Sequence, residues 1–255
     1  MVIKDKVSYN RVEAFSFTIR SNGLVYRRKK SLALIELRDL GKVYKTGKLE
    51  YRALKKVNVD IQEGELTAIV GPSGCGKSTM LNMITGIDRP SSGSVTIGGV
   101  RIDTMKEDKL AAWRGKNIGI VFQFFQLFPT LTAHENAMLP MDFAKISKVK
   151  DREEIARKNL ELVELGDKLN HLPSELSGGE QQRVAIARSL ANDPMIIIGD
   201  EPTGNLDSKT EGRMFDILKK LNDQGKTILY VTHSKELAKK AKRNIRMLDG
   251  EIVGG

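Results

Sequence analysis

The chain has 255 residues, enough for one large domain with a sizeable core, and its 40% apolar and 29% charged residues are ordinary for a globular protein. No apolar run reaches the 18 or so residues of a membrane-spanning helix. The single cysteine, Cys75, excludes an internal disulfide and a cysteine-based zinc site. Because the first residues contain no apolar signal core, we expect a cytosolic protein.

The formal net charge of +10 is unevenly spread. Residues 1–30 contain eight Lys/Arg and two Asp/Glu, so they account for +6 of it. Such a basic stretch is typical of a solvated face, of a contact with an anionic membrane surface, or of nucleic-acid binding. Alternating apolar residues at 15–19 and the turn residues 21–23 predict a marginal hairpin within this extension.

The first clear strands lie beyond residue 33. Residues 35–38 and 57–61 alternate between apolar and polar side chains, which predicts two half-buried strands. Residues 66–70 are short, apolar and β-branched, which predicts a buried parallel strand. Residues 80–84 then read as a helix that Gly86 ends.

A phosphate-binding loop lies between this strand and this helix. The pattern G-x-x-x-x-G-K-[ST] is fitted by Gly71, Pro72, Ser73, Gly74, Cys75, Gly76, Lys77, Ser78 and Thr79. Glycines without Cβ atoms let successive backbone N–H groups turn inward, and the helix N-terminus adds partial positive charge. Lys77 would reach the β- and γ-phosphates, the Ser78 hydroxyl would bind Mg²⁺, and Thr79 would add a contact to the α-phosphate.

The next segments predict a second sheet and a helical block. Residues 95–97 and 100–102, separated by two glycines, predict a hairpin. Residues 118–122 form an apolar strand that ends at Gln123, and residues 152–165 have helical periodicity. A dense apolar cluster follows Gln123 where a surface loop is expected. It consists of Phe124, Phe125, Leu127, Phe128 and Leu131.

Ser177 and Glu180 have the spacing of a capping box at the start of a helix over residues 181–191. That box accounts for these two residues but not for Gly178 and Gly179, which cost about 1 kcal/mol each in a helix. A close approach of phosphate to bare backbone would account for the glycines. Because the phosphate-binding loop already supplies donors, we expect that phosphate to belong to a nucleotide in another subunit.

The last segments place acidic and basic side chains at strand ends. Residues 195–199 predict a buried strand that ends at Asp200 and Glu201, where a carboxylate suits Mg²⁺ and its neighbour suits a general base. Residues 208–221 predict an amphipathic helix, and residues 227–232 predict a strand followed by His233. Residues 245–248 and 251–253 predict a closing hairpin.

From about residue 35 to residue 253 the chain resembles the ATP-binding cassette subunits of membrane transporters. The resemblance rests on the ordered motifs quoted above, together with residues 205–207. Residues 122–132 and 201–208 resemble the branch that includes macrolide-efflux, lipoprotein-release and cell-division ATPases. The resemblance implies an α/β P-loop NTPase fold, with a RecA-like mixed sheet flanked by helices, an antiparallel β subdomain and an α-helical signature subdomain.

The resemblance also implies site roles. Residues 71–79 correspond to Walker A, Asp200 to the Walker B aspartate, and Glu201 to the catalytic base. The remaining implied roles are adenine stacking by Tyr44, Mg²⁺ ligation and a link to the permease by Gln123, γ-phosphate sensing by His233, and the signature motif at Ser177, Gly178, Gly179 and Glu180. Glu180 stands where Gln is commoner, a departure for which we expect no loss of function.

The resemblance implies a basic extension at residues 1–33 and an ATPase domain at residues 34–255, with its helical subdomain at about 124–190. Two copies would enclose two Mg·ATP and drive a separate permease at the inner face of the cell membrane through residues 124–131. That cluster is equally typical of local core. The transported substrate, with export of a peptide, lipoprotein or drug favoured, is not written in this chain.

Two alternatives come from other classes. The basic charge suits a DNA-associated ATPase, but such relatives carry zinc cysteines or long coiled-coil insertions, and this chain has neither. We therefore expect no nucleic-acid partner. A regulatory module that binds ATP without transport is the second alternative.

Overall fold

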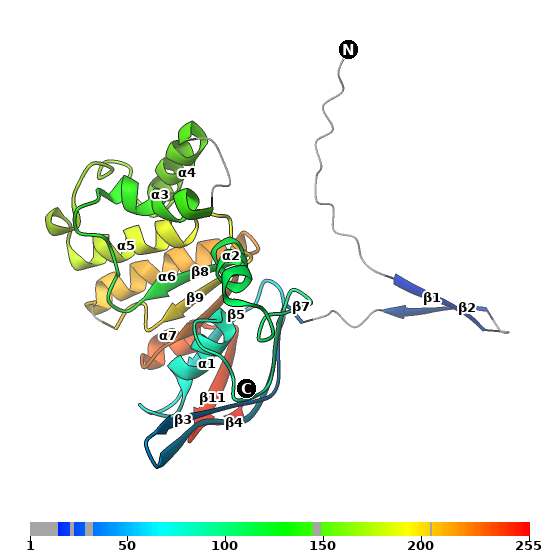
Figure 1. The fold of residues 1–255 in the computed structure, drawn as a ribbon. Coiled ribbons are helices and arrows are strands. Elements are labelled where there is room, and N and C mark those ends of the chain that lie inside the picture. Colours follow the sequence, from blue (N-terminus) through cyan, green and yellow to red (C-terminus); the bar gives the residue numbers. More distant parts are fainter. Residues whose placement is uncertain (1–14, 21–22, 29–32, 145–148, 205) are drawn as a thin grey trace. The chain divides into compact units, whose positions relative to one another are not determined.

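The structure is a computed structural model that describes residues 15–20, 23–28, 33–144, 149–204 and 206–255 (Figure 1). The chain divides into two units, residues 1–32 and residues 33–255. In the first unit, β1 (Phe15–Arg20) pairs antiparallel with β2 (Gly23–Arg28), as the alternating pattern predicts. The expected division into an extension at residues 1–33 and an ATPase domain at residues 34–255 stays a prediction.

The second unit contains a six-stranded mixed sheet with the order β12-β11-β5-β10-β9-β8. Its strands are β5 (Leu66–Val70), β8 (Ile118–Phe122), β9 (Ile196–Asp200), β10 (Thr227–Val231), β11 (Arg243–Leu248) and β12 (Glu251–Gly254). Neighbouring strands are parallel except for the β11–β12 pair. The carboxyl ends of β5, β9 and β10 therefore meet at one edge, which is where polar side chains from different loops can converge.

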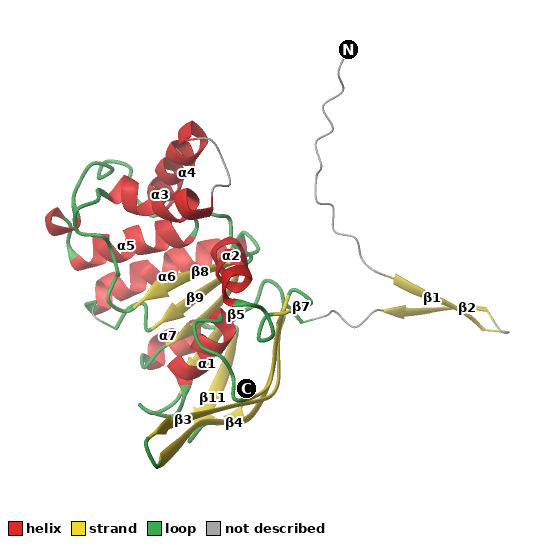
Figure 2. Ribbon diagram, in the orientation of Figure 1, coloured by secondary structure: helices red, strands yellow, loops and turns green. Residues whose placement is uncertain are grey.

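Helices cover this sheet and form a separate group beside β8 (Figure 2). The helices are α1 (Lys77–Thr85), α2 (Glu107–Asn117), α3 (Ala133–Ala144), α4 (Val149–Leu162), α5 (Gly178–Ser189), α6 (Ser208–Asp223) and α7 (Lys235–Lys240), with a short 3₁₀ turn η1 (Pro173–Glu175). Helices α3, α4 and α5 pack against one another, and α5 also contacts β8. Among the described helices, none is both long enough and apolar enough to cross a bilayer.

The central strands β5, β9 and β10 of the large sheet are buried on both faces, so they divide the core into two layers. On β10, Ile228 and Tyr230 pack with α5 and α6, whereas Leu229 and Val231 pack with α1 and the second sheet. Since side chains alternate across a strand, this continuous apolar run supplies both layers. Tyr230 is fully buried, and its hydroxyl donates to the Leu237 carbonyl at 2.9 Å.

The second sheet is antiparallel, with the order β4-β3-β6-β7. It comprises β3 (Ile35–Thr46), β4 (Leu49–Ile61), β6 (Ser92–Ile97) and β7 (Val100–Arg101). The expected strands at 35–38 and 57–61 are thus the ends of a much longer hairpin. Register shifts hid its continuity: Asp39 and Lys56 both have left-handed backbone, with φ of 46° and 51°. The Asn58 side chain ties them together by accepting from Asp39 N at 2.9 Å and donating to the Lys56 carbonyl at 3.0 Å.

Helix boundaries differ from the expected ones at several ends. Helix α1 begins at Lys77, directly after the glycine-rich loop, rather than at residue 80. Helix α4 ends at Leu162 instead of running to residue 165. Helix α5 begins at Gly178, so both glycines lie inside its first turn.

Candidate active site

The glycine-rich loop turns β5 into α1 and needs glycine for two reasons. Gly74 and Gly76 have φ of 76° and 102°, a region that other residues occupy only with strain. A Cβ atom on Gly76 would also lie 2.5 Å from the carbonyl oxygen of Ala53 on β4. The loop is therefore pressed against the antiparallel sheet, and its conformation places the N-terminus of α1 at the sheet edge.

Lys77 places a buried positive charge at this N-terminus. Its side chain is 5% exposed, and its ammonium donates to the carbonyl oxygens of Gly71 at 2.9 Å and Pro72 at 2.8 Å. The ammonium thus lies within the loop, beside the unpaired N–H groups that begin every helix. Both features favour an anion with several oxygens.

Ser78 and Asp200 meet across the sheet edge. The Ser78 hydroxyl donates to Asp200 Oδ1 at 3.0 Å, although the two residues are 122 positions apart. Burial raises the pKa of Asp200, Glu201 raises it further, and the Ser78 hydrogen bond and Lys77 oppose the change. A hydroxyl and a carboxylate are hard oxygen donors, so these two residues fit Mg²⁺.

Glu201 and His233 form the next pair along this edge. His233 Nε2 contacts Glu201 Oε1. Glu201 has a left-handed backbone with φ of 48°, and such strain persists where the surrounding structure requires one side-chain direction. With this backbone conformation, the Glu201 carboxylate reaches His233 in the loop that follows β10.

A cavity of about 230 Å³ brings most of the predicted loop residues together with this pair. It is lined by Ser73, Gly74, Gly76, Lys77, Ser78, Thr79, Glu201 and His233, all of them predicted, and by Tyr51, which was not predicted. The Tyr51 hydroxyl donates to the Gly74 carbonyl at 2.9 Å. Tyr51 pairs with the predicted Tyr44 across β3 and β4. This pairing could have identified Tyr51 as a site residue, but it requires the strand register, which the sequence does not show.

Tyr44 lies outside the lining of that cavity. Its ring is partly exposed, its hydroxyl donates to Asp88 Oδ2 at 2.9 Å, and Lys42 Nζ lies 4.8 Å from the ring centroid. Burial and then the neighbouring Asp88 carboxylate raise the pKa of Tyr44. The ring is therefore fixed at its edge and leaves a face accessible.

Gln123 directly follows β8 and lies beside the loop that carries Glu201. A Cβ atom on Gly204 would lie 3.0 Å from Gln123 Nε2, so the amide is packed against this loop. On the same edge, the Asp207 carboxylate caps α6 by accepting from the backbone N–H groups of Lys209 and Thr210, each at 3.0 Å. Gln123 directly follows Phe122, the last residue of β8, which pairs with Asp200 on β9.

Ser177 and Glu180 form the predicted capping box. The Ser177 hydroxyl and N–H donate to Glu180 Oε2 at 2.7 Å and 2.8 Å, and these bonds hold the pKa of Glu180 below its usual range. None of residues 177–180 is among the residues that line the cavity around Lys77. Ser177 and Gly178 instead lie exposed at the N-terminus of α5.

The two glycines of this turn differ in whether packing within the chain requires them. A Cβ atom on Gly179 would lie 2.5 Å from Thr210 Cγ2 on α6, so packing inside this chain already requires glycine there. A Cβ atom on Gly178 would approach nothing nearer than Phe125 Cζ, at 3.6 Å. Only Gly178 is left for the close phosphate approach that the sequence suggested for both.

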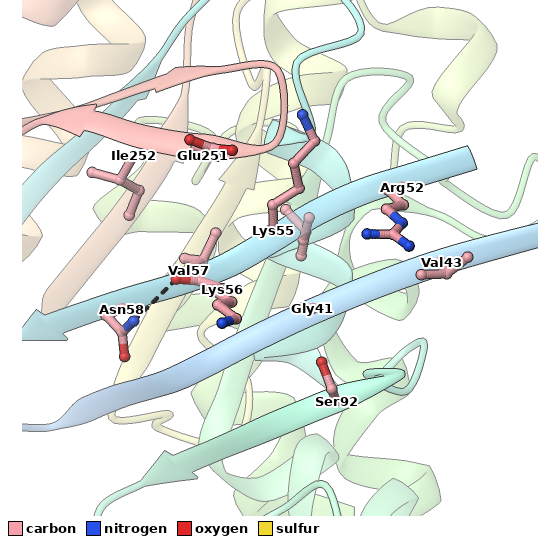
Figure 3. A pocket seen from close by; sticks show the side chains of 11 residues that line it. Gly41, Val43, Arg52, Lys55, Lys56, Val57, Asn58, Ser92, Glu251 and Ile252 are labelled. Atoms are coloured by element: carbon pink, nitrogen blue, oxygen red, sulfur yellow. Dashed lines mark hydrogen bonds between the residues drawn. The ribbon is translucent and has the colours of Figure 1, made fainter. Parts of the chain in front are cut away.

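A second, larger cavity of about 720 Å³ lies away from these residues (Figure 3). Its lining comes from β3, β4, β6 and β12 and includes Arg52, Lys55 and Lys56 on β4 and Glu251 on β12. Its lining contains no residue of the glycine-rich loop, neither Asp200 nor Glu201, and no histidine. Size alone therefore does not identify the active site, whereas the convergence of Lys77, Asp200 and Glu201 does.

Comparison with known proteins agrees with this geometry. Residues 54–204 match the family model for the ABC transporter. The chain belongs to the ABC transporter family. An ABC transporter ATP-binding protein of Methanocaldococcus jannaschii, MJ1508, is 51% identical over 86% of this chain and 98% of that protein. The lipoprotein-releasing system ATP-binding protein LolD of Geobacter metallireducens is 44% identical over 87% of this chain and 98% of LolD.

The fold has the same relatives. A dimeric structure of the ATP-binding cassette MJ0796 of M. jannaschii, in a post-hydrolysis state bound to ADP and Pi, superposes with a TM-score of 0.80. It is 46% identical and covers 86% of this chain and 96% of that one. The expected fold and the expected branch are confirmed, and the chain is an ATP-binding, ATP-hydrolysing subunit of an ABC transporter.

Proposed function

We propose that two copies of this chain pair head to tail and enclose two ATP molecules. Each nucleotide lies between Lys77 of one copy and the Ser177–Gly178 turn of the other. The observation that supports this is the separation within one chain: the turn at the start of α5 is exposed and lies outside the cavity that holds Lys77, Ser78 and Glu201. A helix N-terminus capped by Ser177 suits a terminal phosphate that arrives from outside the chain.

The residues in and around this cavity have separate roles in hydrolysis. Glu201 orients and deprotonates the attacking water, and His233, which contacts that carboxylate, also senses the γ-phosphate. Lys77 and the loop N–H groups stabilise the charge that spreads over the transferred phosphoryl group. Ser78, Asp200 and Gln123 would hold Mg²⁺, which would supply positive charge that neutralises the phosphates. Tyr44 stacks on adenine.

The pairing drives a separate membrane permease. The support is an exposed apolar surface next to Gln123, where Phe124 is 70% and Phe128 is 50% exposed. Exposed aromatic side chains of this kind mark partner sites. The subunit works at the cytoplasmic face of the membrane and serves export or release of a peptide, lipoprotein or drug. Residues 1–33 form a basic extension outside the ATPase domain at residues 34–255, whose helical subdomain spans about 124–190.

Size-exclusion chromatography of Glu201→Gln tests the pairing. This variant keeps the shape of the carboxylate but cannot accept the proton, so it binds ATP without turnover and accumulates as a dimer in saturating ATP. Lys77→Ala in the same background is the control and stays monomeric, because it lacks the phosphate contact. A Glu201→Gln protein that binds ATP yet elutes only as a monomer contradicts the proposal.

A coupled assay tests the transport role. The wild-type chain is expected to hydrolyse ATP faster when its genomically neighbouring permease is reconstituted with it in vesicles. Removing the apolar surface with Phe124→Ser and Phe128→Ser abolishes that stimulation and leaves the basal rate unchanged. Equal stimulation of the wild type and the double variant would exclude this surface as the coupling site.

A further inference from the structure

Arg188, on the helix that begins at the signature turn, binds two consecutive carbonyl groups of the loop after Gln123. Its Nη2 donates to the Phe125 carbonyl at 2.8 Å, and its Nη1 donates to the Gln126 carbonyl. Burial lowers the pKa of this arginine. Within the described part of the chain, no carboxylate pairs with Arg188, so its partly buried guanidinium is balanced only by neutral carbonyl oxygens. Burying a charge in this way is unfavourable unless each of its bonds is well made.

The loop that Arg188 binds has a strained backbone. Phe125 and Gln126 are both left-handed, with φ of 33° and 55°, and neither is glycine. The Gln126 N–H also donates to the Phe124 carbonyl, which closes a tight three-residue turn. Two adjacent non-glycine residues in this region are costly and persist only where the surroundings enforce them.

The left-handed backbone of the loop allows Arg188 to bind both carbonyl groups, and this binding in turn stabilises the left-handed backbone. In an extended strand, successive carbonyl groups point in opposite directions, so a single guanidinium could not reach both. In successive left-handed residues they point to one side, where the planar fork of an arginine binds two acceptors at once. Arg188 therefore stabilises the turned form of the loop over an extended one.

The same helix also holds the strand that precedes the loop. Gln182 is fully buried, and its Nε2 donates to the Phe122 carbonyl at 3.1 Å. Helix α5 therefore donates hydrogen bonds to backbone carbonyl groups on both sides of Gln123: to the residue before it, and to the second and third residues after it. The N-terminus of this helix carries Ser177.

We propose that Arg188 is a positioning residue that fastens the Gln123 loop to α5, so that Gln123 and Ser177 move as one rigid piece. This inference rests on the proposed function, because it assigns Gln123 to the nucleotide of its own copy and Ser177 to that of the partner copy. A push on the exposed Phe124 then displaces both contacts together, since the turned loop cannot absorb the movement.

Hydrogen exchange of the full-length chain, followed by mass spectrometry, tests the fastening directly. Arg188→Lys keeps the charge but cannot fork, so the amides of Gln126 and Phe128 are expected to exchange about tenfold faster than in the wild type. The matched control is Arg114→Lys. Arg114 lines the same cavity of about 220 Å³ as Arg188 but donates to a carbonyl of another segment, that of Gly86 at 2.8 Å. It should leave those amides within about twofold of the wild type.

A second variant covers the case in which Arg188→Lys does not fold. Gln126→Pro lies at an exposed position, leaves the arginine in place and forbids the left-handed backbone, because proline fixes φ near −65°. It should speed exchange at Phe128 to a similar extent. Wild-type exchange in both variants, or equal acceleration in Arg114→Lys, overturns the proposal.

A catalytic readout separates positioning from general support. In Arg188→Lys, the Mg²⁺ concentration for half-maximal ATPase activity should rise about tenfold, since Gln123 is no longer held, while the melting temperature of Arg188→Lys stays close to that of Arg114→Lys. An unchanged Mg²⁺ requirement counts against the proposal. If the wild type pairs on ATP but the exchange rates do not differ, only the fastening fails. If the wild type does not pair, the exchange comparison still decides the fastening, and the proposed pairing fails separately.

Discussion

The imidazole of His233 contacts the carboxylate of Glu201 through Nε2, although the two residues follow different strands of the large sheet, β10 and β9. The contact joins the loop after β9 to the loop after β10. It also occupies Oε1 of the carboxylate to which the proposed mechanism assigns the attacking water. The resting arrangement therefore has to loosen at this pair before hydrolysis, and substitutions here should separate binding from turnover.

His233→Ala is expected to lower kcat about 100-fold while the dissociation constant for ATP changes by about twofold or less. The reason is that the proposed role of the histidine, to orient Glu201 and sense the γ-phosphate, acts on turnover, whereas Lys77 and the loop N–H groups provide most of the binding to the phosphates. Single-turnover hydrolysis and a fluorescent-nucleotide titration measure the two quantities. Tyr51→Phe, which removes a hydroxyl from the same cavity, is the control and should keep kcat. A weakened affinity with normal turnover in His233→Ala would contradict this role.

Gly179→Ala should destabilise the protein by about 2 kcal/mol, because the added methyl group overlaps Thr210 Cγ2. Thr210→Ser removes that methyl group and keeps the hydroxyl, which donates to Asp207 Oδ2 at 2.6 Å. The double variant is therefore expected to recover most of the loss. Urea unfolding of the four proteins gives the coupling. Additive losses in the double variant would show that packing against Thr210 is not the reason for this glycine.

Asp200→Asn should raise the melting temperature of the metal-free protein by a few degrees at neutral pH. Because the pKa of Asp200 is higher in the folded than in the unfolded chain, its contribution to stability is complete below the unfolded pKa. That contribution is lost as the pH rises through the folded pKa. The asparagine removes this loss, so the two proteins should converge at acidic pH.

The same variant should lose the stabilisation that Mg·ATP gives the wild type, since an amide cannot replace a carboxylate as the Mg²⁺ ligand. Thermal melts across pH, with and without Mg·ATP, contain both measurements. Ser208→Ala, at an exposed residue outside the cavity lining, is the control and should follow the wild type. A variant less stable than the wild type at neutral pH without metal contradicts the assignment.

Tyr44→Ala should weaken ATP binding about tenfold, which is the size expected for the loss of one stacking partner. Tyr44→Phe keeps the ring and loses only the hydrogen bond to Asp88, so its affinity should stay within about threefold of the wild type. Isothermal titration with ATP and with inorganic triphosphate separates the base from the phosphates. Equal losses for both ligands would place Tyr44 near the phosphates and not at adenine.

Asn136→Ala should cost about 3 kcal/mol of stability and lower the melting temperature by roughly 6–12 °C. Asn136 is fully buried, and its amide donates to the carbonyl groups of Phe128, Leu131 and Thr132 and accepts from the Phe128 N–H. Alanine leaves these groups buried without partners. Asn170→Ala, at an exposed site, is the comparison. A change of less than about 1 kcal/mol in Asn136→Ala would mean that water replaces the amide.

The sequence predicted the parts of this molecule whose chemistry is local. The glycine-rich loop has a contiguous pattern, and Asp200 and His233 follow apolar runs that read directly as strands. It did not predict α2 or α3. Helix α2 has only Leu110 buried, so it has no apolar stripe, and α3 contains Pro140, which interrupts a helical pattern.

Long-range contacts account for the remaining differences. The cause of Gly179 is a threonine on another helix, and the partner of Tyr51 becomes visible only when the strand register is known. Arg188 resembled any basic residue on an amphipathic helix until its two carbonyl acceptors were located 62 and 63 positions away in the chain. No local pattern contains such pairs, because each is created by the way the sheet and the helical group come together.

The position of Lys77 has a consequence for the entropy that is lost when the loop binds a nucleotide. Its ammonium already lies inside the phosphate-binding loop, where it donates to two carbonyl oxygens. When a nucleotide binds, phosphate oxygens replace these two acceptors, and the lysine side chain does not have to be ordered first. Little rotational freedom of this lysine is therefore lost on association, and the loop is preorganised for its ligand. A ligand without phosphate groups has no oxygens to replace these carbonyl acceptors, so adenosine alone should leave the hydrogen bonds of Lys77 unchanged.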